Sequence, residues 1–435
     1  MKKNQLNLLI LYFLTFFLFF QFSIFNYNNG IIGTFFIFIV SLFLYLVGRY
    51  QCSIAHVLFV AFALRLTAII LNNYFYQLPD AVGDSSYFEF LAYECSKDGF
   101  LNALSQYHNG NCSQSHFISY IIGIFYSLFG RDILIGQSIS LLFGTLSVLI
   151  TFILTKKLWG DRSAVKASWF VAFFPSLILY SSLIMREPYI VFFLLLALNY
   201  AVNFFILPSL KFLSLTISFF LIATLFHGAI FIGLIVFLSI MMISYFKKIL
   251  RKTRIHKIRF NTFCIFFLVT SFILSLFLIN PKIPKIGNLQ DIELIKQNIL
   301  NKNKSFRGTA SYPEWLNSHT ISDLILKIPL KILYFTYSPF PWDVKKTSHL
   351  VGVLDGIFYS YLSYLIFLNK KNIWRDPGSR VIFLIFLAYI IVFSIAIGNF
   401  GTGVRHRSKF VAIFILLAAP LLPKFTTQLK KKNFK

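Results

Sequence analysis

The sequence is poor in acidic residues and in cysteine. Only 15 of the 435 residues are Asp or Glu, charged residues of both signs make up 13% of the chain, and there are four cysteines. Ordinary soluble domains have about 25% charged residues, so the composition excludes a typical soluble domain. The cysteines form no Cys-x-x-Cys pair and have no metal-ligand spacing, so the sequence indicates no cysteine-bound metal.

Motifs of nucleotide-dependent and hydrolytic enzymes are also lacking. The chain contains no P-loop, no Gly-x-Gly-x-x-Gly stretch, no His-Glu-x-x-His pair and no nucleophile elbow. We therefore expect the energy for any reaction to arrive in an activated substrate. The net charge of +26 does not indicate nucleic acid, because the Lys and Arg residues are dispersed between apolar runs instead of gathered on one domain.

Hydrophobic residues are abundant, at 57% of the chain with 55 Phe. A hydrocarbon core about 30 Å thick takes about 20 residues to cross, and runs of that kind recur from end to end. The sequence therefore predicts one integral membrane domain over residues 1–435, an all-α polytopic membrane protein with about 12 transmembrane helices. We expect the crossings at 5–25, 31–48, 53–72, 133–155, 164–183, 188–206, 211–226, 229–246, 261–279, 349–368, 381–397 and 408–423.

The loops between these crossings predict the orientation. Basic segments at 155–166, 247–259 and 369–380, together with the Lys-rich tail, all fall on one side. Lys and Arg gather in cytoplasmic loops, so this side is expected to be the cytoplasm, with both termini there. The basic start of the chain resembles a signal peptide but lacks a small-residue cleavage site, and we expect it to remain as the first crossing.

Two large loops are expected on the opposite, periplasmic face, at residues 73–132 and 280–348. Each contains an apolar stretch, at 116–130 and 324–342. We interpret both stretches as helices that lie along the membrane interface, because another crossing would invert the later loops.

Acidic residues are concentrated on the same expected face. Twelve of the 15 lie in outer segments, which topology alone does not require. The outer face is therefore the expected place for chemistry. Cys95 and Cys112 share the first outer loop, where they either form a disulfide or stay free.

The first candidate site lies in "LPDAVGDSSYFEFLAYECSKDG", residues 78–99. A Pro and a Gly precede Asp84, and apolar or aromatic residues then repeat at helical spacing from Tyr87 onward, beside Glu89. Asp84 is either the N-cap of this helix, with the other acids on its wet face, or a carboxylate that accepts a proton from a sugar hydroxyl at the membrane surface.

The second candidate is the Arg186–Glu187 pair in the tight turn "SSLIMREPYIVFF" between two crossings. One interpretation is a local ion pair, because a Glu at a helix start is favourable and Pro188 suits the first turn. In the other, Arg186 faces a lipid-linked phosphate and Glu187 orients a partner.

The third candidate is "GNFGTGVRHRSKF", residues 398–410. Its glycines are expected to loosen the backbone before Arg405, His406 and Arg407. In a helix, Arg405 and Lys409 would share a face, with Arg407 turned roughly 160° away; near a helix start, both arginines can instead point outward through the loop. One guanidinium group can bind two phosphate oxygens at once, so these arginines are candidates for phosphate binding. The alternative is that their side chains extend to lipid headgroups.

Three further ionisable residues lie within or close to crossings. Arg65 lies inside the third expected span. Ionisable side chains are costly inside a membrane, so one that occurs there is a candidate for a function. Asp355 either pairs with Arg65 or lines a cavity. His227, between two crossings on the outer face, is either an interfacial histidine with its hydrogen bonds satisfied or part of the site.

Taken together, these segments resemble the GT-C superfamily of membrane glycosyltransferases, nearest the branch of protein O-mannosyltransferases and lipid A aminoarabinose transferases. "GDSSYFEFLAYECSKDG" resembles the first outer loop of that family, and the stretch from "FYSLFGRDILIG" to "SSLIMREP" resembles its region from interfacial helix to second outer turn. "ISDLILKIPLKILYFTYSPFPW" and "GNFGTGVRHRSKFVAIFILLAAP" resemble later segments of bacterial relatives from surface-polysaccharide systems. The chain departs from the pattern in having two extra spans and Arg-Glu where an Asp is usual.

The resemblance implies inverting transfer of a sugar from a polyprenyl-phosphate or diphosphate carrier to a glycan or lipid acceptor, at the periplasmic face of a bacterial inner membrane. Asp84 would be the general base, with Glu187 or Asp80 assisting. Arg186, Arg405 and Arg407, with His406, would hold the phosphate. Some relatives use a divalent metal; this chain offers no clear ligand set, and we expect none.

Two other functions fit a basic polytopic protein. A polymerase of O-antigen or capsule repeat units would also use outer-face arginines, but it does not require an acidic helix in the first outer loop. A flippase of lipid-linked oligosaccharides would be expected to show internal repeats and mid-membrane charges, and no repeat is evident. A scaffold without activity is the remaining alternative.

Overall fold

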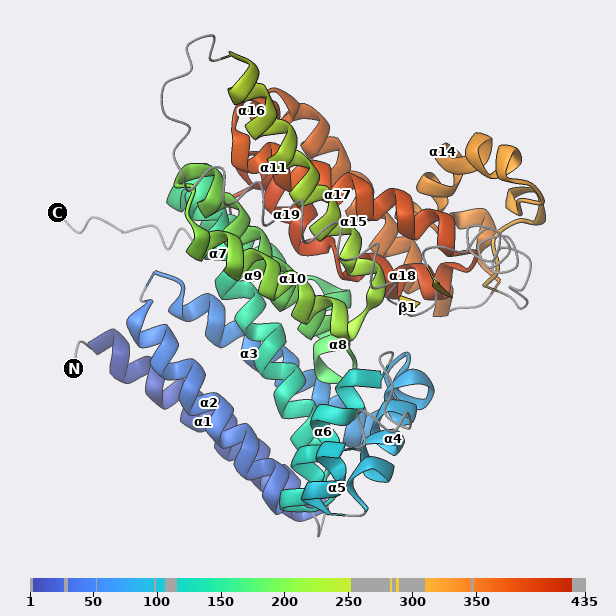
Figure 1. Ribbon diagram of the computed structural model, residues 1–435. Helices are drawn as coiled ribbons and strands as arrows, with labels where there is room; N and C mark the ends of the chain where they lie inside the picture. The colour runs from blue at the N-terminus through green and yellow to red at the C-terminus, as the bar shows by residue number, and fades with distance from the viewer. Residues whose placement is uncertain are drawn as a thin grey trace, which may run out of the picture.

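The computed structural model describes residues 3–26, 30–51, 53–97, 99–105, 116–251, 282–283, 287–288, 310–345 and 348–424. These residues are almost entirely helical (Figure 1), with one pair of two-residue strands, β1 (Lys282–Ile283) and β2 (Gly287–Asn288). The helices are α1 (Lys3–Asn26), α2 (Ile31–Tyr50), α3 (Ala55–Ile70), α4 (Ser86–Ser96), α5 (Phe100–Ser105), α6 (Phe117–Phe129), α7 (Ile133–Phe173), α8 (Pro175–Ser182), α9 (Glu187–Ile206), α10 (Leu210–Phe226), α11 (Phe231–Arg251), α14 (Ile321–Tyr337), α15 (Ser348–Leu368), α16 (Lys370–Arg375), α17 (Pro377–Ala396), α18 (Phe400–Ser408) and α19 (Val411–Ala418).

Several of these helices suit a membrane. Within the described part of the chain, six are long and apolar enough to cross one: Ile31–Tyr50, Ala55–Phe75, Ile133–Phe173, Glu187–Ile206, Gly228–Tyr245 and Pro377–Ala396. Others that coincide with expected crossings, such as α10, form shorter apolar helices. The all-helical, membrane-protein class is therefore confirmed, whereas the number of twelve crossings stays a prediction, and the expected span 261–279 lies outside the described residues.

The long helix α7 folds back on itself at Gly160. This glycine has φ 79° and ψ 174°, a backbone conformation that side chains with a Cβ disfavour. The Arg65 side chain lies against Gly144 and also donates to the Ala172 carbonyl at 3.4 Å. In a straight helix, residues 144 and 172 would be about 42 Å apart. The chain therefore reverses between the two crossings expected at 133–155 and 164–183.

Two expected crossings differ from the structure. The run 164–183 is interrupted at Phe174, where the backbone is extended and Pro175 starts α8. The run 408–423 contains only the eight-residue α19 and a following 3-10 turn, Ala419–Leu421. Every side chain of α19 is buried, and α19 packs against α7 and α15, so this most apolar segment is a core helix.

The helices interpreted as interfacial are short or interrupted. α6 has 13 residues and covers about 20 Å, too little to cross a membrane. It packs along α4, where the Ser119 hydroxyl donates to the Phe88 carbonyl at 2.8 Å. α14 contains Pro329 and projects from the rest of the helices (Figure 1). Both features agree with helices that lie outside the membrane core.

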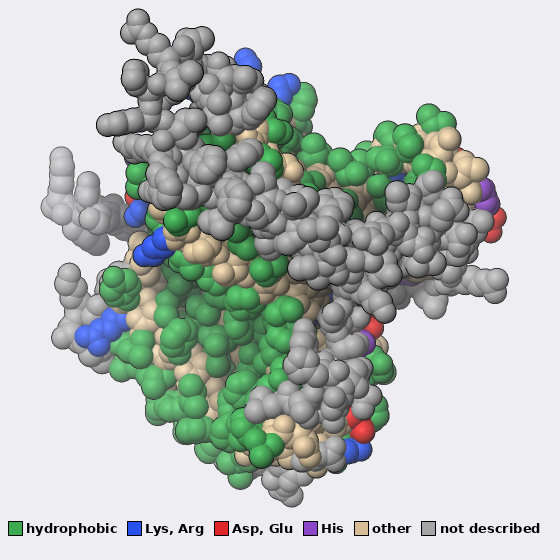
Figure 2. All heavy atoms as spheres, in the orientation of Figure 1, with side chains coloured by type: hydrophobic (Ala, Val, Ile, Leu, Met, Phe, Trp, Pro, Cys, Tyr) green, Lys and Arg blue, Asp and Glu red, His purple; other side chains and the backbone are tan. Residues whose placement is uncertain are grey.

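The two ends of the helical body carry different residues. In Figure 1, α16 lies at one end, and α4, α5 and α18 lie toward the other. Most of the Asp, Glu and His side chains visible in Figure 2 lie along its right-hand edge, near α4 and α14, whereas Lys and Arg predominate at the left and upper edges. A broad apolar face separates them. This separation agrees with the charge pattern expected from the sequence.

Candidate functional site

Three segments converge at the end of the molecule that carries α4 and α18. They are the turn Ala81–Ser85, the connection between α8 and α9, and α18. The backbone N–H of Ile184 donates to the Ser85 hydroxyl at 3.1 Å, which joins the first two segments. The Ser182 hydroxyl donates to the Arg65 carbonyl at 3.1 Å, which holds the second segment against α3.

The third segment, α18, is held by its N-cap and by backbone hydrogen bonds of the residues just before it to residues 310 and 312. The side chain of Asn399 caps α18 by accepting from the N–H groups of Gly401 and Thr402. The Tyr312 N–H donates to the Gly398 carbonyl, and the Phe400 N–H donates to the carbonyl of residue 310, both at 2.9 Å. The glycines expected to loosen this stretch are therefore part of a capped helix, and the basic residues occupy its last turn, where the helix dipole favours cations.

The faces of α18 follow the expectation from helical spacing. Arg405 and Lys409 both reach the carboxylate of Glu187, with closest distances of 3.6 and 3.5 Å to its Oε1. Arg407 points to the other side of the helix and contacts Asp355. Of the two orientations considered from the sequence, the structure has the helical one, in which Arg407 is turned away from Arg405.

Glu187 is the centre of the cluster. Its Oε1 lies within 4.0 Å of three cations, because Arg186 approaches it to 4.0 Å in addition to Arg405 and Lys409. The side chain of Glu187 is 2% exposed, and its oxygens accept no hydrogen bond from the described residues. The Arg186–Glu187 pair is thus more than a local helix cap. We call Glu187, Arg186, Arg405 and Lys409 the Glu187 cluster.

Asp84 lies at the mouth of this cluster. Its carboxylate pairs with the guanidinium of Arg405, and its side chain is 46% exposed, against 13% for Arg405. The residues that flank the turn, Asp80 and Ser85, make no side-chain cap hydrogen bond. Asp84 therefore connects the solvent to the buried cations. Asp80 has φ 64°, interacts with the Tyr180 hydroxyl and adds negative potential at Arg405.

His406 and His227 form one wall of the site. Their rings meet edge to face at 5.2 Å, and each also packs on Phe393. Burial, followed by the charges of Lys409 and Arg405 among its neighbours, holds the pKa of His406 well below its ordinary value. The Nδ1 of His406 contacts the Lys409 ammonium, so a neutral imidazole that accepts from Lys409 fits this position.

The arginines of the site are also desolvated. Burial lowers the pKa of Arg186 from its usual value, and Glu187 opposes this shift. Burial likewise lowers the pKa of Arg405, and Asp80 opposes it. Guanidinium groups stay charged in proteins, so these shifts mean that the site holds cations at a cost in solvation. An anionic ligand would reduce that cost.

Arg65 approaches the cluster from inside the protein. It is fully buried, and its Nη1 donates to the carbonyls of Ala61 and Ala172. Its Nε and Nη2 have no hydrogen-bond partner among the described residues. Arg65 and Glu187 line the same small internal cavity, together with Tyr180 and Ser408. A buried water in this cavity would satisfy both groups.

Three predicted site residues lie elsewhere. Arg407 is fully buried and paired with Asp355, so Asp355 contacts Arg407 and not Arg65. Glu89 receives two hydrogen bonds from Arg131, at 2.9 and 2.8 Å, which ties α4 to the start of α7. Tyr87 is half-exposed and packs edge-on against His116. Arg407 and Glu89 are engaged in these ion pairs and Tyr87 packs on His116, so we assign none of the three to the site.

The residues brought together are Asp80, Asp84, Arg186, Glu187, His227, Arg405 and His406, with Arg65 behind them. Lys409 and Phe393 complete the site and were not among the predicted site residues. Lys409 could have been identified from its position four residues after Arg405; Phe393 carries no sequence signal, because it is one of many Phe residues in spans.

Cys95 forms a disulfide bond, and its expected partner Cys112 lies outside the described residues. In the described ranges, no group of three or more His, Cys, Asp or Glu side chains is placed to hold a metal ion. Comparison with protein-family models, curated proteins and solved structures gives no match for this chain.

Proposed function

We propose that the protein is a membrane glycosyltransferase that moves a sugar from a polyprenyl-phosphate or diphosphate carrier to a glycan or lipid acceptor. The observation that carries the proposal is the arrangement of three cations around Glu187 with the exposed Asp84 at their edge. Cations at a membrane-helix end suit a lipid-linked phosphate, and a carboxylate beside them suits activation of a hydroxyl.

The location of the site supports this chemistry. Glu187 is the first residue of α9, a helix long and apolar enough to cross a membrane. A polyprenyl chain in the bilayer would therefore present its phosphate at this level. The disulfide at Cys95, in the loop that carries Asp84, suits an oxidising compartment, which favours the periplasmic face. In this orientation the protein spans a bacterial inner membrane, and both termini lie on the cytoplasmic side.

The proposed reaction assigns one role to each side of the site. The acceptor oxygen attacks the anomeric carbon of the sugar, its proton passes to the Asp84 carboxylate, and the bond from that carbon to the phosphate oxygen breaks. The carrier phosphate leaves with an added negative charge. Arg405, Arg186 and Lys409 stabilise this charge, which is the term that usually contributes most to such catalysis.

The ion pair between Arg405 and Asp84 links donor binding to activation of the base. While paired, the Asp84 carboxylate is occupied by a guanidinium and is a poor proton acceptor. A donor phosphate competes for Arg405 and releases Asp84. Glu187 keeps the three cations together and takes no proton in this scheme. Asp80, near Arg405 and Tyr180, assists in positioning.

The test is the Asp84→Asn variant, assayed for sugar transfer in membranes from a deletion strain. We expect transfer to fall about 10²- to 10⁴-fold, the range for loss of a general base, while the protein still inserts in the membrane. Glu94→Gln is the matched control, because Glu94 is 39% exposed, lies on α4 and pairs only locally with Lys97. Full activity of Asp84→Asn would refute the proposed base.

The surface glycan of the deletion strain separates the proposed function from its rivals. Loss of a single sugar is the expected result for a transferase. A glycan reduced to one repeat unit would identify a repeat-unit polymerase that uses the same phosphate site. Lipid-linked oligosaccharide retained on the cytoplasmic side would identify a transporter.

A further inference from the structure

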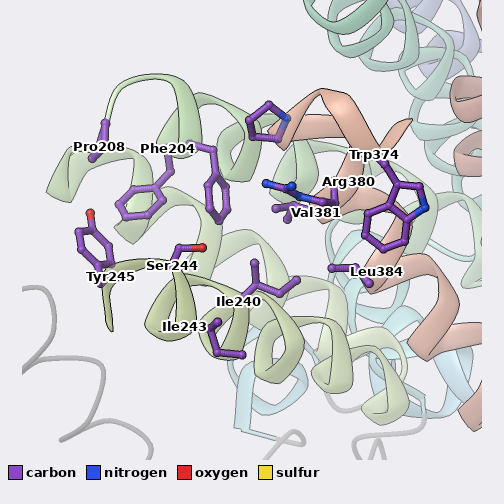
Figure 3. Close-up of a pocket in the computed structure, with 12 residues that line it drawn as sticks. Phe204, Pro208, Ile240, Ile243, Ser244, Tyr245, Trp374, Arg380, Val381 and Leu384 are labelled. Atoms are coloured by element: carbon purple, nitrogen blue, oxygen red, sulfur yellow. The ribbon is translucent and has the colours of Figure 1, made fainter. Parts of the chain in front are cut away.

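A second cavity lies at the opposite end of α9 from Glu187. It has a volume of about 650 Å³ and is formed by the ends of α9, α11 and α17, with Trp374 of α16 at its edge (Figure 3). Phe204, near the end of α9, lies 17 residues after Glu187, which corresponds to about 25 Å along the helix axis. The cavity is therefore separate from the Glu187 cluster and lies near the other membrane surface.

The walls of this cavity are apolar. Phe204 and Phe205 contribute from α9, Ile240 and Ile243 from α11, and Leu384 from α17. Figure 3 shows Phe204, Ile240 and Leu384 on different sides of the same space. A cavity of this size that opens beside membrane helices and is lined by hydrocarbon favours an acyl chain over a polar metabolite.

One cation points into the apolar space. Arg380, in the first turn of α17, extends from its helix into the cavity toward the side formed by Phe204 (Figure 3). Its guanidinium makes no ion pair with a carboxylate of the described residues. The helix that precedes α17 is also basic, because Lys370, Lys371 and Arg375 lie on α16. The local charge is therefore complementary to an anionic headgroup.

The edge of the cavity has the composition of a membrane interface. Trp374 is 50% exposed at the rim, and the side chains of Tyr245 and Ser244 line the opposite side of the cavity (Figure 3). Tryptophan and tyrosine concentrate at headgroup level, and basic pockets between membrane helices bind anionic lipid headgroups. The polar rim and the apolar interior thus match the two parts of one phospholipid.

We propose that this cavity binds an anionic phospholipid, with an acyl chain between α9, α11 and α17 and the phosphate at Arg380. A phosphate near one basic residue gains about 1 kcal/mol, which corresponds to about fivefold in affinity. The acyl chain supplies the remaining affinity by burial, which also applies to zwitterionic lipids. The lipid site does not depend on the proposed transferase activity, because it shares no residue with the Glu187 cluster.

The test measures lipid binding to the purified full-length protein by native mass spectrometry. The probes are phosphatidylglycerol and phosphatidylethanolamine with identical acyl chains. We expect phosphatidylglycerol to bind more tightly, and Arg380→Gln to weaken it about fivefold with little change for phosphatidylethanolamine. Arg375→Gln is the matched control, since it removes the same charge one helix away without lining the cavity. We expect it to weaken phosphatidylglycerol binding clearly less than Arg380→Gln does and to leave phosphatidylethanolamine binding unchanged.

A steric variant tests the apolar part independently of charge. Ser244→Phe places a ring in the cavity and should abolish tight binding of both lipids. Three results would overturn the proposal: equal losses in Arg380→Gln and Arg375→Gln, unchanged binding in Ser244→Phe, or no tightly bound lipid in the wild type, as when another part of this chain fills the cavity. Asp84→Asn should retain the lipid, so failure of the transferase proposal is recognised separately.

Discussion

Arg405 and Arg407 lie two residues apart on α18, yet their guanidinium groups differ in how many hydrogen bonds they donate. Arg407 donates to Asp355 through Nε at 3.0 Å and to the carbonyls of Thr336, Ser338 and Gly352 through its other nitrogens. The guanidinium carbon (Cζ) of Arg407 also lies 4.9 Å from the ring centre of Tyr359. We call Arg407 and Asp355 the Asp355 cluster.

The Glu187 cluster is different because its cations approach the Glu187 carboxylate without donating a hydrogen bond to it. Arg186, Arg405 and Lys409 lie 3.5 to 4.0 Å from one oxygen of Glu187. Buried carboxylates normally accept hydrogen bonds, and one that accepts none from the described residues, such as Glu187, is a candidate for a ligand-binding site. Arg407 therefore holds the fold together, whereas Arg405, beside the exposed Asp84, belongs to the proposed anion site.

The largest expected effect comes from breaking the Asp355 cluster. Arg407→Met and Asp355→Asn should each lower the free energy of unfolding by about 3–5 kcal/mol, because each leaves a buried charge or its partners uncompensated. The measurement is equilibrium unfolding of the detergent-solubilised protein. The double variant Arg407→Met/Asp355→Leu removes both charges, so it should be more stable than either single variant.

The matched control for this prediction is Arg405→Met. Its partner Asp84 is largely hydrated once released, and Arg186 and Lys409 remain beside Glu187, so the loss should be below about 1 kcal/mol. Equal losses for Arg405→Met and Arg407→Met would contradict the comparison between the two clusters.

Much of the helical framework could be predicted from the sequence. The expected runs 31–48, 188–206 and 211–226 agree with α2, α9 and α10 to within two residues, because apolar runs end at polar or Pro-containing turns. The break at Phe174 had a signal in Pro175, but the uninterrupted apolar run outweighed it. The burial of α19 was not predictable, since hydropathy does not distinguish a lipid-facing helix from a core helix.

The site could be predicted in its residue types but not in its pairings. Helical spacing offered the orientation in which Arg407 turns away from Arg405, but the predicted site still included both arginines. The partner of Asp355 depends on which helices meet: Arg65 and Arg407 are both intramembrane or near-membrane cations, and only the packing of α15 against α18 brings Arg407 to it. The role of Lys409 likewise required Glu187 to be placed opposite α18, which involves segments more than 200 residues apart.

The next largest effect should be on phosphate binding, and it sharpens the same comparison. Arg405→Gln should weaken binding of a polyprenyl phosphate to the purified protein by about 1.5–3 kcal/mol, the usual range for a hydrogen bond to a charged group. Lys97→Gln is the control, since Lys97 is an exposed cation paired with Glu94 outside the site. Unchanged affinity in Arg405→Gln would return this arginine to the role of a headgroup contact.

A smaller effect on stability is expected for Glu187→Gln, together with a stronger response to an added anion. Removal of the central carboxylate leaves Arg186, Arg405 and Lys409 in mutual repulsion, so the free energy of unfolding should fall by about 1–3 kcal/mol. The same change adds one net positive charge, so inorganic pyrophosphate should raise the thermal midpoint of the variant more than that of the wild type. A variant that gains no more from pyrophosphate than the wild type would show that the cations do not form an anion site.

The smallest expected effect is the pH dependence contributed by His406. The folded protein lowers the pKa of His406 well below its ordinary value, through burial and then Lys409, His227, Arg405 and Arg186. Below the unfolded value of about 6.5 the unfolded chain binds this proton and the native protein does not, so stability falls as pH falls. The slope approaches about 1.4 kcal/mol per pH unit as the pH falls below about 6.5. His406→Gln should remove this slope from unfolding curves. Equal slopes in the variant and the wild type would mean that His406 is protonated in the native site.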